Sequence, residues 1–383
     1  MSTFLIIYFF VAVALSLTIN YLLLKFSFNL GSRNNLAFNQ VRWSSHVKPS
    51  VGGISFFIIF LISWGVFSLV NHEQSLVADK QIIGFVAAVS LGFFAGLYDD
   101  AFNTIPLAKF FLQLACGIIL VVCGITINIS NWAPLDVFFT LIWVIGLMNS
   151  INMLDNMDGV TASVSALIIA GIVMVILLTS NVSGNFFLLM LTGMLGALAG
   201  FLRFNWSPSK IFMGDTGSQF LGIFLAATSI LFFWQFNEGN QGLIQVKPFV
   251  LPALFFIIPI IDTTTVTLRR LIRGQSPFVG GKDHITHHLA YLGLNEKQVV
   301  FILLATTAPS FVIAGLLIRN TISWNFYTSF GVLGYIITVF FIFQYLYSKG
   351  ARRHAEKLHD DRPIPKITKE SLAAFAEKMH MKN

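Results

Sequence analysis

The sequence predicts an all-α polytopic membrane protein. Of its 383 residues, 56% are hydrophobic and only 11% are charged, whereas a typical soluble domain carries about 25% charged residues. A soluble enzyme of this length would need far more polar surface to cover its core. The composition therefore excludes a soluble globular protein, a disordered chain and a disulfide scaffold.

Apolar runs fill most of the length, and most of them reach the roughly 17–25 residues that a spanning helix needs. We predict about eleven crossings, at residues 3–24, 51–70, 81–98, 105–126, 135–151, 160–180, 185–203, 216–236, 248–268, 299–318 and 326–347. The first run has no Lys or Arg before it and no small-residue cleavage pattern soon after it, so we interpret it as a membrane helix rather than a signal peptide. The run 135–151 is short and is expected to be tilted or partly re-entrant.

The basic residues predict the orientation. When loops are assigned to alternate sides, 21 of the 24 Lys and Arg fall on the side of the first loop, and only Lys80, Lys247 and Arg319 fall on the other. The positive-inside rule makes the first side cytoplasmic. The N-terminus is then predicted outside and the C-terminus in the cytoplasm, with an integral membrane domain at 1–348 and a basic cytoplasmic tail at 349–383.

Polar residues that are unfavourable in lipid gather at helix ends on the predicted cytoplasmic side. They form five groups: Asp99-Asp100, residues 149–159, residues 203–206, residues 212–218 and residues 283–288. The membrane body is therefore predicted to be a scaffold for one polar face. The net charge of +7 favours anionic lipid or an anionic substrate near that face.

Acidic clusters on this face indicate a site for a hard cation. Asp99 and Asp100 are adjacent and repel each other unless a cation is present. Asp155 and Asp158 are three residues apart and would share a face on a helix. Asp215 precedes the eighth predicted helix, which it could cap. Carboxylate and amide oxygens suit Mg²⁺, although any one of these acids could also be an ordinary helix cap.

Basic residues and histidines on the same face suit the oxygens of a diphosphate. The loop 269–298 alone carries Arg269 and three histidines. Zinc is disfavoured because the only thiolates, Cys116 and Cys123, lie inside an apolar run. Phosphate contact or proton transfer fits the histidines better. Phe212 could stack on a base or sugar, or could simply pack.

The order of these motifs resembles the polyprenyl-phosphate N-acetylhexosamine-1-phosphate transferases, of the glycosyltransferase family 4 type. The resemblance covers roughly residues 40–345 and rests on the aspartate pair, the Asn-x-x-Asp-x-x-Asp-Gly stretch and Phe-Met-Gly-Asp-Thr-Gly-Ser, in that order. The Arg-rich segment 269–278 looks most like the bacterial undecaprenyl-phosphate GlcNAc-1-phosphate transferases. The family's eleven-helix layout matches the predicted crossings.

The resemblance implies a Mg²⁺-dependent phosphotransferase, with Mn²⁺ as an alternative ion. A UDP-N-acetylhexosamine, UDP-GlcNAc first, would bind at the cytoplasmic face of the plasma or inner membrane. Undecaprenyl phosphate would attack the β-phosphorus, UMP would leave, and the first lipid-linked intermediate of a cell-wall or lipopolysaccharide-type polymer would remain. Phosphoryl transfer needs mainly positioning and charge neutralisation, which fits these residues. Membrane lipid is a further expected partner, nucleic acid is not, and a homodimer is left open.

The same resemblance gives roles to single residues. Asp99 would deprotonate or orient the lipid phosphate, with Asp100 as a second candidate. Asn152 and Asp215 would be the metal ligands. The predicted substrate-binding residues are Lys48, Lys109, Asp155, Asp158, Asn205, Phe212, Arg269, His284, His287 and His288.

Two departures from the family pattern and two alternatives remain at this point. Asn156 stands where many members have Gly, and the histidines read His-x-x-His-His rather than His-x-His-His. The phospho-MurNAc-pentapeptide translocase branch, which usually has three consecutive histidines, is the alternative within the family. A membrane transporter is the alternative from another class, but the charges lie at helix ends and no internal repeat is visible.

Overall fold

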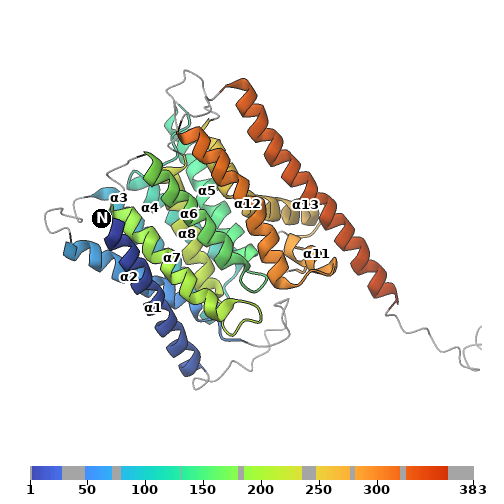
Figure 1. Ribbon diagram of the computed structural model, residues 1–383, viewed down its shortest axis with the longest axis horizontal. Coiled ribbons are helices and arrows are strands. Elements are labelled where there is room, and N and C mark those ends of the chain that lie inside the picture. Colours follow the sequence, from blue (N-terminus) through green and yellow to red (C-terminus); the bar gives the residue numbers. More distant parts are fainter. Residues whose placement is uncertain are drawn as a thin grey trace, which may run out of the picture.

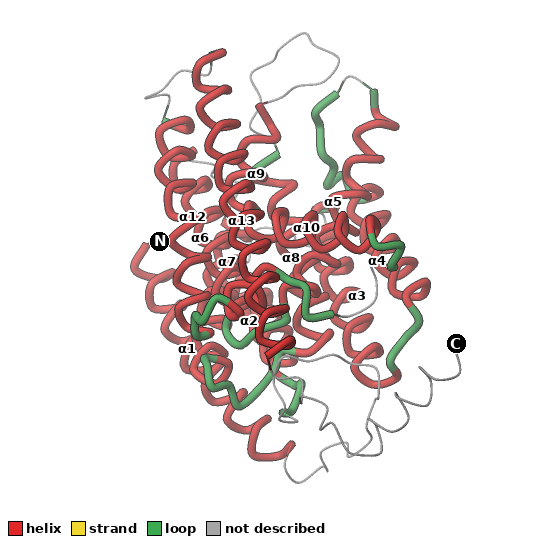
Figure 2. The backbone as a smooth tube through the Cα atoms, turned by 90° about the vertical axis from the view of Figure 1, so that its right-hand side faces the viewer, coloured by secondary structure: helices red, strands yellow, loops and turns green. Residues whose placement is uncertain are grey.

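The computed structural model describes residues 2–27, 48–70, 79–130, 132–179, 185–234, 247–276, 281–319 and 325–360. Within these ranges the protein is helical and forms no β-strand, apart from one isolated bridge between Ser50 and Phe212 (Figure 2). The predicted all-α class is therefore confirmed for the described part. Of the predicted tail, the residues up to Asp360 continue the last helix without a break, and residues 361–383 lie outside the described ranges.

Figure 1 shows the helices packed side by side, with the last one reaching beyond the others. Their bounds are α1 Ser2–Ser27, α2 Gly52–Val70, α3 Lys80–Phe102, α4 Pro106–Val122, α5 Ala133–Leu154, α6 Val160–Thr179, α7 Asn185–Asn205, α8 Gly214–Phe232, the 3₁₀ turn η3 Lys247–Phe249, α9 Val250–Phe255, α10 Ile257–Ile272, α11 Ile285–Tyr291, α12 Glu296–Ile318 and α13 Phe326–Asp360.

In the described part of the chain, nine helices are long and apolar enough to cross a membrane. The predicted run 105–126 forms the shorter α4, of 17 residues. The predicted run 248–268 is divided at Phe256 into α9 and α10, because Pro259 has no N–H to donate to the carbonyl of Phe255. The run 135–151 belongs to a continuous helix of 22 residues, so the expectation that it is short or re-entrant is wrong.

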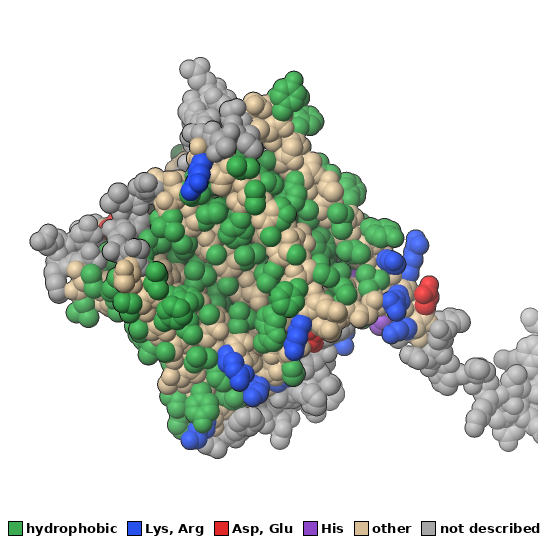
Figure 3. Space-filling model, in the orientation of Figure 1, with side chains coloured by type: hydrophobic (Ala, Val, Ile, Leu, Met, Phe, Trp, Pro, Cys, Tyr) green, Lys and Arg blue, Asp and Glu red, His purple; other side chains and the backbone are tan. Residues whose placement is uncertain are grey.

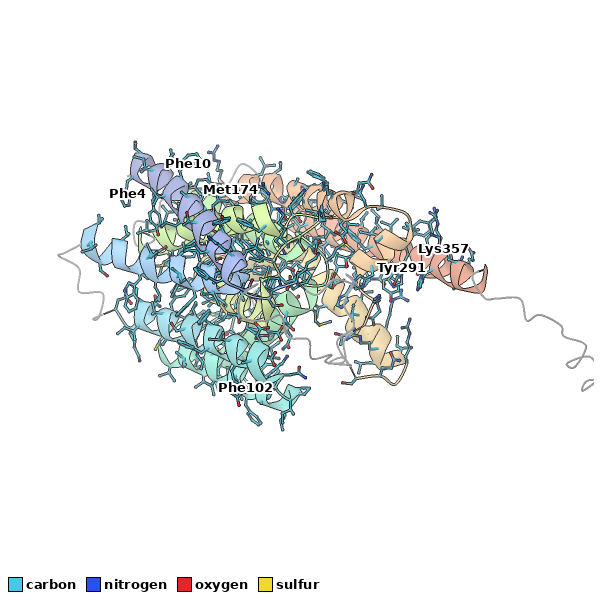
Figure 4. All side chains as sticks on the ribbon, turned by 90° about the horizontal axis from the view of Figure 1, so that it is seen from below. Phe4, Phe10, Phe102, Met174, Tyr291 and Lys357 are labelled. Atoms are coloured by element: carbon cyan, nitrogen blue, oxygen red, sulfur yellow. The ribbon has the colours of Figure 1, made fainter. Side chains whose placement is uncertain are left out.

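Helix α8 lies at the centre of the bundle, in contact with α2, α3, α5 and α6. In the apolar 18-residue stretch of α8, 89% of the residues are buried, whereas the corresponding shares are 22% in α1 and 17% in α13. The central α8 is also less hydrophobic than the outer helices, with a mean hydropathy of 1.2 against 2.2 in α1 and 1.9 in α13, as expected when the outer helices face lipid and the central one faces protein. Phe10 on α1 and Phe102 on α3 point away from the bundle (Figure 4), as expected for lipid-facing side chains.

Phenylalanines fill the space between α2, α3 and α8, which accounts for part of the total of 40 in the chain. Phe60, Phe85, Phe220 and Phe224 are all buried, and each has a neighbouring ring within 6.3 Å, in edge-on, tilted or stacked arrangement. Offset and edge-to-face pairs of this kind add to the packing of large rings. The core thus holds α2 and α3 firmly against α8.

Charged side chains are unevenly distributed over the surface. Figure 3 shows a mostly hydrophobic face, with most of the visible Lys and Arg along its lower and right-hand margins. Such a band of apolar surface bounded by basic residues fits a multi-pass membrane protein. Cys116 and Cys123 are both free.

Candidate active site

The first turn of α8 is held by Asp100, near the end of α3. Asp100 Oδ1 accepts a hydrogen bond from the backbone N–H of Asp215 at 3.0 Å, and Oδ2 accepts from the N–H and hydroxyl of Thr216 at 2.8 and 2.6 Å. The prediction that Asp215 caps α8 is therefore wrong, because Asp215 lies inside the first turn. A carboxylate from a neighbouring helix satisfies the free N–H groups instead, and its charge complements the helix dipole.

Glycines allow α2 and α3 to approach this turn. A Cβ at Gly96 would fall on the carbonyl of Asp215, and a Cβ at Gly53 would fall on the backbone nitrogen of Gly217. Gly214 has a φ of +72°, a conformation that other residues rarely adopt. The glycine-rich sequence around Asp215 is thus explained by close backbone packing, as is common between membrane helices.

Four predicted residues from four helices meet at Asp215. Asn152, at the end of α5, donates its Nδ2–H to Asp215 Oδ1 at 2.7 Å. Lys109 Nζ, from α4, lies 3.3 Å from Asp215 Oδ2 and also pairs with Oδ2 of Asp99, from α3. The ammonium group thus lies between the carboxylates of Asp99 and Asp215 and offsets their mutual repulsion.

The two carboxylates lie in different surroundings. The Asp99 side chain is only 4% exposed, and its Oδ1 accepts hydrogen bonds from the N–H and hydroxyl of Thr104 at 2.8 and 2.6 Å. The side chains of Lys109 and Asp215 are each 30% exposed. A ligand can therefore contact Lys109 and Asp215 directly, whereas Asp99 lies deeper and is held by its own loop.

The oxygen donors at this position fit a hard divalent cation. Asp99, Asp215 and Asn152 supply carboxylate and amide oxygens, which Mg²⁺ prefers. The side-chain amide of Asn152 directs its nitrogen to Asp215, and a 180° rotation of the amide group would direct its oxygen there instead. No group of three or more His, Cys, Asp and Glu with metal-site geometry occurs in the described ranges. A cation would therefore need phosphate oxygens or water to complete its shell, as is usual for Mg²⁺.

Three amide side chains lie one helical turn away from this cluster, further along each helix into the bundle. Gln113 donates to Gln219 at 3.2 Å and to Asn149 at 3.3 Å, and Asn149 donates back to Gln113 at 2.8 Å. The pairs one turn apart are Lys109 and Gln113 in α4, Asn149 and Asn152 in α5, and Asp215 and Gln219 in α8. Because buried amides must pair with each other in apolar surroundings, this triad fixes how α4, α5 and α8 are aligned along their axes.

A second cluster forms around Asp158, in the turn after α5. Asp158 Oδ2 accepts from the backbone N–H of Ser209 at 2.8 Å, and Oδ1 accepts from the Ser209 hydroxyl at 2.8 Å. Lys48 Nζ lies 3.4 Å from Asp158 Oδ2 and donates to the Ser209 hydroxyl at 2.9 Å. The ammonium of Lys48 also lies 5.1 Å from the centre of the Phe212 ring, a cation–π distance.

Asn205 supports the loop between α7 and α8 from inside. Its side chain accepts from the N–H of Gly159 at 3.0 Å and donates to the carbonyl of Ile211 at 2.9 Å. Asn205 is only 3% exposed, so its hydrogen bonds hold the loop in place. Phe212 is fixed through its backbone, which donates to the carbonyl of Pro49 at 3.0 Å and accepts from the N–H of Gly52 at 3.0 Å.

A third cluster contains the histidines, at the start of α11. Asp262 of α10 lies 2.8 Å from His284 Nδ1 and accepts from the N–H of Ile285 at 2.8 Å. The hydroxyl of Thr286 donates to Asn156 Oδ1 at 2.6 Å. Asn156, one of the two departures from the family pattern, thus connects the turn after α5 to the histidine helix.

His287 and His288 are both buried, so the neutral imidazole is favoured. Burial, reinforced by the charge of His284, lowers the pKa of His287 to about 3. Burial, reinforced by the charge of Arg269, lowers the pKa of His288 to about 4. Nδ1 of His288 is buried and has no hydrogen-bond partner among the described residues.

Arg269, at the end of α10, lies on the side of the histidine cluster that faces α13. Its guanidinium lies 4.0 Å from the centre of the Tyr347 ring and donates to Gln344 at 3.2 Å. The next residue, Arg270, pairs with both oxygens of Asp283 at 2.9 and 2.7 Å. Burial alone would raise the pKa of Asp283, but this bidentate pair outweighs it and lowers the pKa.

The last turn of α5 and the turn that follows it connect all three clusters. Asn152 reaches the first cluster, Asp158 the second and Asn156 the third. The prediction that Asp155 and Asp158 share a helix face is wrong, because α5 ends at Leu154 and residues 155–159 form a turn. Asp155 follows the helix directly and is half-buried.

Several residues of the site were not predicted. Asp262 lies inside an apolar run, and a charge there could have indicated a partner such as His284. Gln113 and Gln219 could have been found from their spacing of four residues from Lys109 and Asp215. Thr104 and Ser209 carry no such signal, because their role depends on how the loops fold.

We predict that Gln113→Leu destabilises the protein by about 1–2 kcal/mol, because it removes the hydrogen-bond partner that Asn149 and Gln219 share in apolar surroundings. Phe111→Leu, on the exposed face of the same helix, is the matched control. Thermal unfolding of the purified proteins measures the difference. Equal melting temperatures for the two variants would contradict a role of the triad.

We predict that stability falls with acidification below about pH 6.5. The pKa values of His287 and His288 in the folded protein, about 3 and about 4, lie below the ordinary 6.5, so the unfolded chain binds protons first. The contribution of the neutral, buried His287 and His288 to the stability of the fold is complete above pH 6.5 and is lost as the pH falls towards 4. Melting temperatures at pH 7.5 and 5 should differ less in His288→Gln than in the wild type. An unchanged difference would contradict the burial of a neutral His288.

The sequence profile described as "Glycosyl transferase family 4" matches residues 82–233, which include the first cluster. A "Probable undecaprenyl-phosphate N-acetylglucosaminyl 1-phosphate transferase" of Bacillus subtilis is 28% identical over 268 residues, covering 67% of this chain and 70% of the relative. The "Undecaprenyl-phosphate alpha-N-acetylglucosaminyl 1-phosphate transferase" of Escherichia coli K12 is 25% identical over 311 residues, covering 78% and 79%.

A third relative comes from another bacterial group. The "Decaprenyl-phosphate N-acetylglucosaminephosphotransferase" of Mycobacterium tuberculosis H37Rv is 27% identical over 292 residues, covering 67% of this chain and 70% of the relative. The profile match, the three relatives and the order of the acidic motifs agree with one another. In these residues and motifs the chain is similar to the members of glycosyl transferase family 4.

Proposed function

We propose that this protein transfers an N-acetylhexosamine 1-phosphate, with GlcNAc-1-phosphate the first candidate, from its UDP-activated form to undecaprenyl phosphate. UMP is released, and the lipid-linked sugar diphosphate begins a cell-envelope polysaccharide. The observation that carries the proposal is the meeting of two carboxylates, one ammonium and one amide at the first turn of α8. The relatives' names, which specify a polyprenyl phosphate acceptor and N-acetylglucosamine, support the choice of substrates.

The charges of the first cluster suit the reacting phosphates. In the proposed step, an oxygen of the acceptor phosphate bonds to the β-phosphorus while the bond from that phosphorus to its bridging oxygen breaks, and UMP leaves with the bridging oxygen. Lys109, which is exposed enough to meet a ligand, would bind phosphate oxygens. Asp99, held by Thr104 and Lys109, would orient the acceptor phosphate or accept its proton.

Asn152 and Asp215 would hold Mg²⁺, which neutralises the diphosphate charge and polarises the β-phosphorus. Their contact of 2.7 Å means that one ion could reach both side chains without a large movement. The two oxygens of Asp100 accept hydrogen bonds from α8, which favours a capping role for Asp100 over proton transfer. Of the two candidate bases, we therefore prefer Asp99.

The second and third clusters would bind the rest of the donor. Lys48 and Phe212 offer a cation and a ring side by side, which suits a nucleotide, while Asp155 and Asp158 would contact it from the turn. Asn205 would act by holding that turn. His284, His287, His288 and Arg269 would lie towards the sugar diphosphate. His288, neutral at physiological pH, would act there as a hydrogen-bonding group rather than as a cation.

We also propose eleven crossings, with the N-terminus outside and the active site on the cytoplasmic face. Nine crossings would be the nine long helices. The other two would be α4 and the pair α9–α10, whose apolar lengths approach the span that a bilayer needs. The distribution of Lys and Arg along the sequence supports this orientation.

An apolar groove between α10 and α13, of about 190 Å³, supports a lipid acceptor. It is lined only by hydrophobic side chains, among them Ile257, Ile261, Ile336 and Phe340. Ile261 directly precedes Asp262, which holds His284, so the groove begins close to the third cluster. A polyprenyl chain would find a surface of matching character there.

The experiment is an assay of the purified protein with undecaprenyl phosphate, Mg²⁺ and a panel of UDP-N-acetylhexosamines. UMP release together with a lipid-linked product is expected with UDP-GlcNAc. Turnover of UDP-MurNAc-pentapeptide alone would favour the translocase branch instead. No product with any donor would contradict the proposed function.

We predict that Asp215→Asn lowers turnover by about 100-fold or more, because it weakens both the metal site and the pairing with Lys109. Asp79→Asn, at the exposed start of α3, is the matched control and should keep wild-type turnover. Both proteins should unfold at the wild-type temperature to within a few degrees. Wild-type turnover of Asp215→Asn at ordinary Mg²⁺ would contradict the assignment.

A further inference from the structure

Helix α13 is longer than a membrane crossing requires. Its 35 residues span roughly 50 Å at 1.5 Å per residue, whereas the hydrocarbon core of a bilayer is roughly 30 Å thick. Its last turns carry Lys349, Arg352, Arg353 and Lys357, which belong in water. Figure 3 shows basic side chains gathered at the right-hand end of the molecule, where α13 leaves the bundle. The end of α13 therefore extends outside the membrane.

This extension packs against the histidine helix. A Cβ at Gly350 would fall on the carbonyl oxygen of His288 and lie 3.0 Å from the His288 Cβ, so glycine is the residue that fits there. The Tyr347 ring lies 3.6 Å from the His288 ring, measured between ring centres. Figure 1 shows α11 directly beside this part of α13. His288 is thus in contact with α13 through both its backbone and its ring.

The C-terminal end of α11 is also held by the extension. Arg353 donates to the carbonyl of Leu292 at 2.6 Å, and the His354 ring stacks on Tyr291 at 3.9 Å and an angle of 5°. Figure 4 shows Tyr291 beside α13, with Lys357 further along that helix. A helix of seven residues is not stable by itself in water, so α11 depends on such contacts.

The same part of α13 holds Arg269 of α10. Tyr347, which is only 1% exposed, lies between the guanidinium of Arg269 and the ring of His288. Gln344 accepts from Arg269 at 3.2 Å and donates to Thr265, also on α10, at 2.5 Å. Two groups assigned to the sugar diphosphate therefore rest on opposite sides of one tyrosine.

We propose that residues 344–354 of α13 form a clamp that fixes His288 and Arg269 in the geometry that binds the sugar diphosphate. Tyr347, Gly350, Arg353 and His354 are then positioning residues, since they act through His288 and Arg269. The inference rests on the proposed function for the ligand, but the clamp itself rests only on the contacts of α13. Loss of the clamp should weaken binding of the UDP-sugar more than it slows the chemical step.

The test compares Gly350→Ala with Gly334→Ala. Gly334 lies on the same helix, and a Cβ there would meet nothing within 4 Å, so Gly334→Ala is a matched control. In Gly350→Ala the KM for UDP-GlcNAc should rise about tenfold with a much smaller change in kcat. Backbone amides of residues 285–292 should exchange with solvent faster, while those of α8 should not.

A second pair of variants covers the case in which Gly350→Ala does not fold. His354→Ala should raise KM and speed exchange in α11, whereas His354→Phe keeps the stacked ring and should restore both. Unchanged KM in Gly350→Ala and His354→Ala would overturn the clamp, whether or not exchange changes. If the wild type has no activity with any UDP-N-acetylhexosamine, the proposed function fails. Amide hydrogen exchange in α11 then tests the clamp independently of activity. Exchange rates in Gly350→Ala and His354→Ala equal to those of the wild type would overturn the clamp.

Discussion

The start of α8 lies inside the protein, and its free N–H groups need a partner there. Asp100 supplies one from α3, with the help of glycines that let the two helices touch. A buried helix end without such a partner would be strongly destabilised. Because this contact fixes α3 against α8, it also brings Asp99 and Asp215 to the same lysine. The arrangement of the first cluster is thus a consequence of how one helix is capped.

The end of α5 and the turn that follows it extend this arrangement to the rest of the polar face. Asn152, Asn156 and Asp158 lie within seven residues and reach the three clusters in turn. The amide triad below the first cluster keeps α4, α5 and α8 aligned, and α13 supports the third cluster from outside. A site for a large nucleotide sugar can in this way be assembled from short segments, each fixed by a helix end.

Composition and the positions of unfavourable polar residues predicted the helical membrane class and a polar face with acidic clusters, and the family resemblance indicated which of these residues act together at Asp215. The sequence did not predict the break at Phe256, since the apolar run continues through Pro259 without a change in hydropathy. It also placed Asp155 and Asp158 on a helix that ends before them. The different surroundings of Asp99 and Asp100 could not be predicted either, because they depend on which carboxylate faces α8.

The most direct test of this account compares Asp99→Ala with Asp100→Ala, two neighbours of identical chemistry. Melting temperature and UMP release are measured for both. The account predicts that Asp100→Ala lowers the melting temperature more, because the cap of α8 is lost, while Asp99→Ala stays folded and loses turnover. A more stable Asp100→Ala than Asp99→Ala, or wild-type turnover in Asp99→Ala, would contradict it.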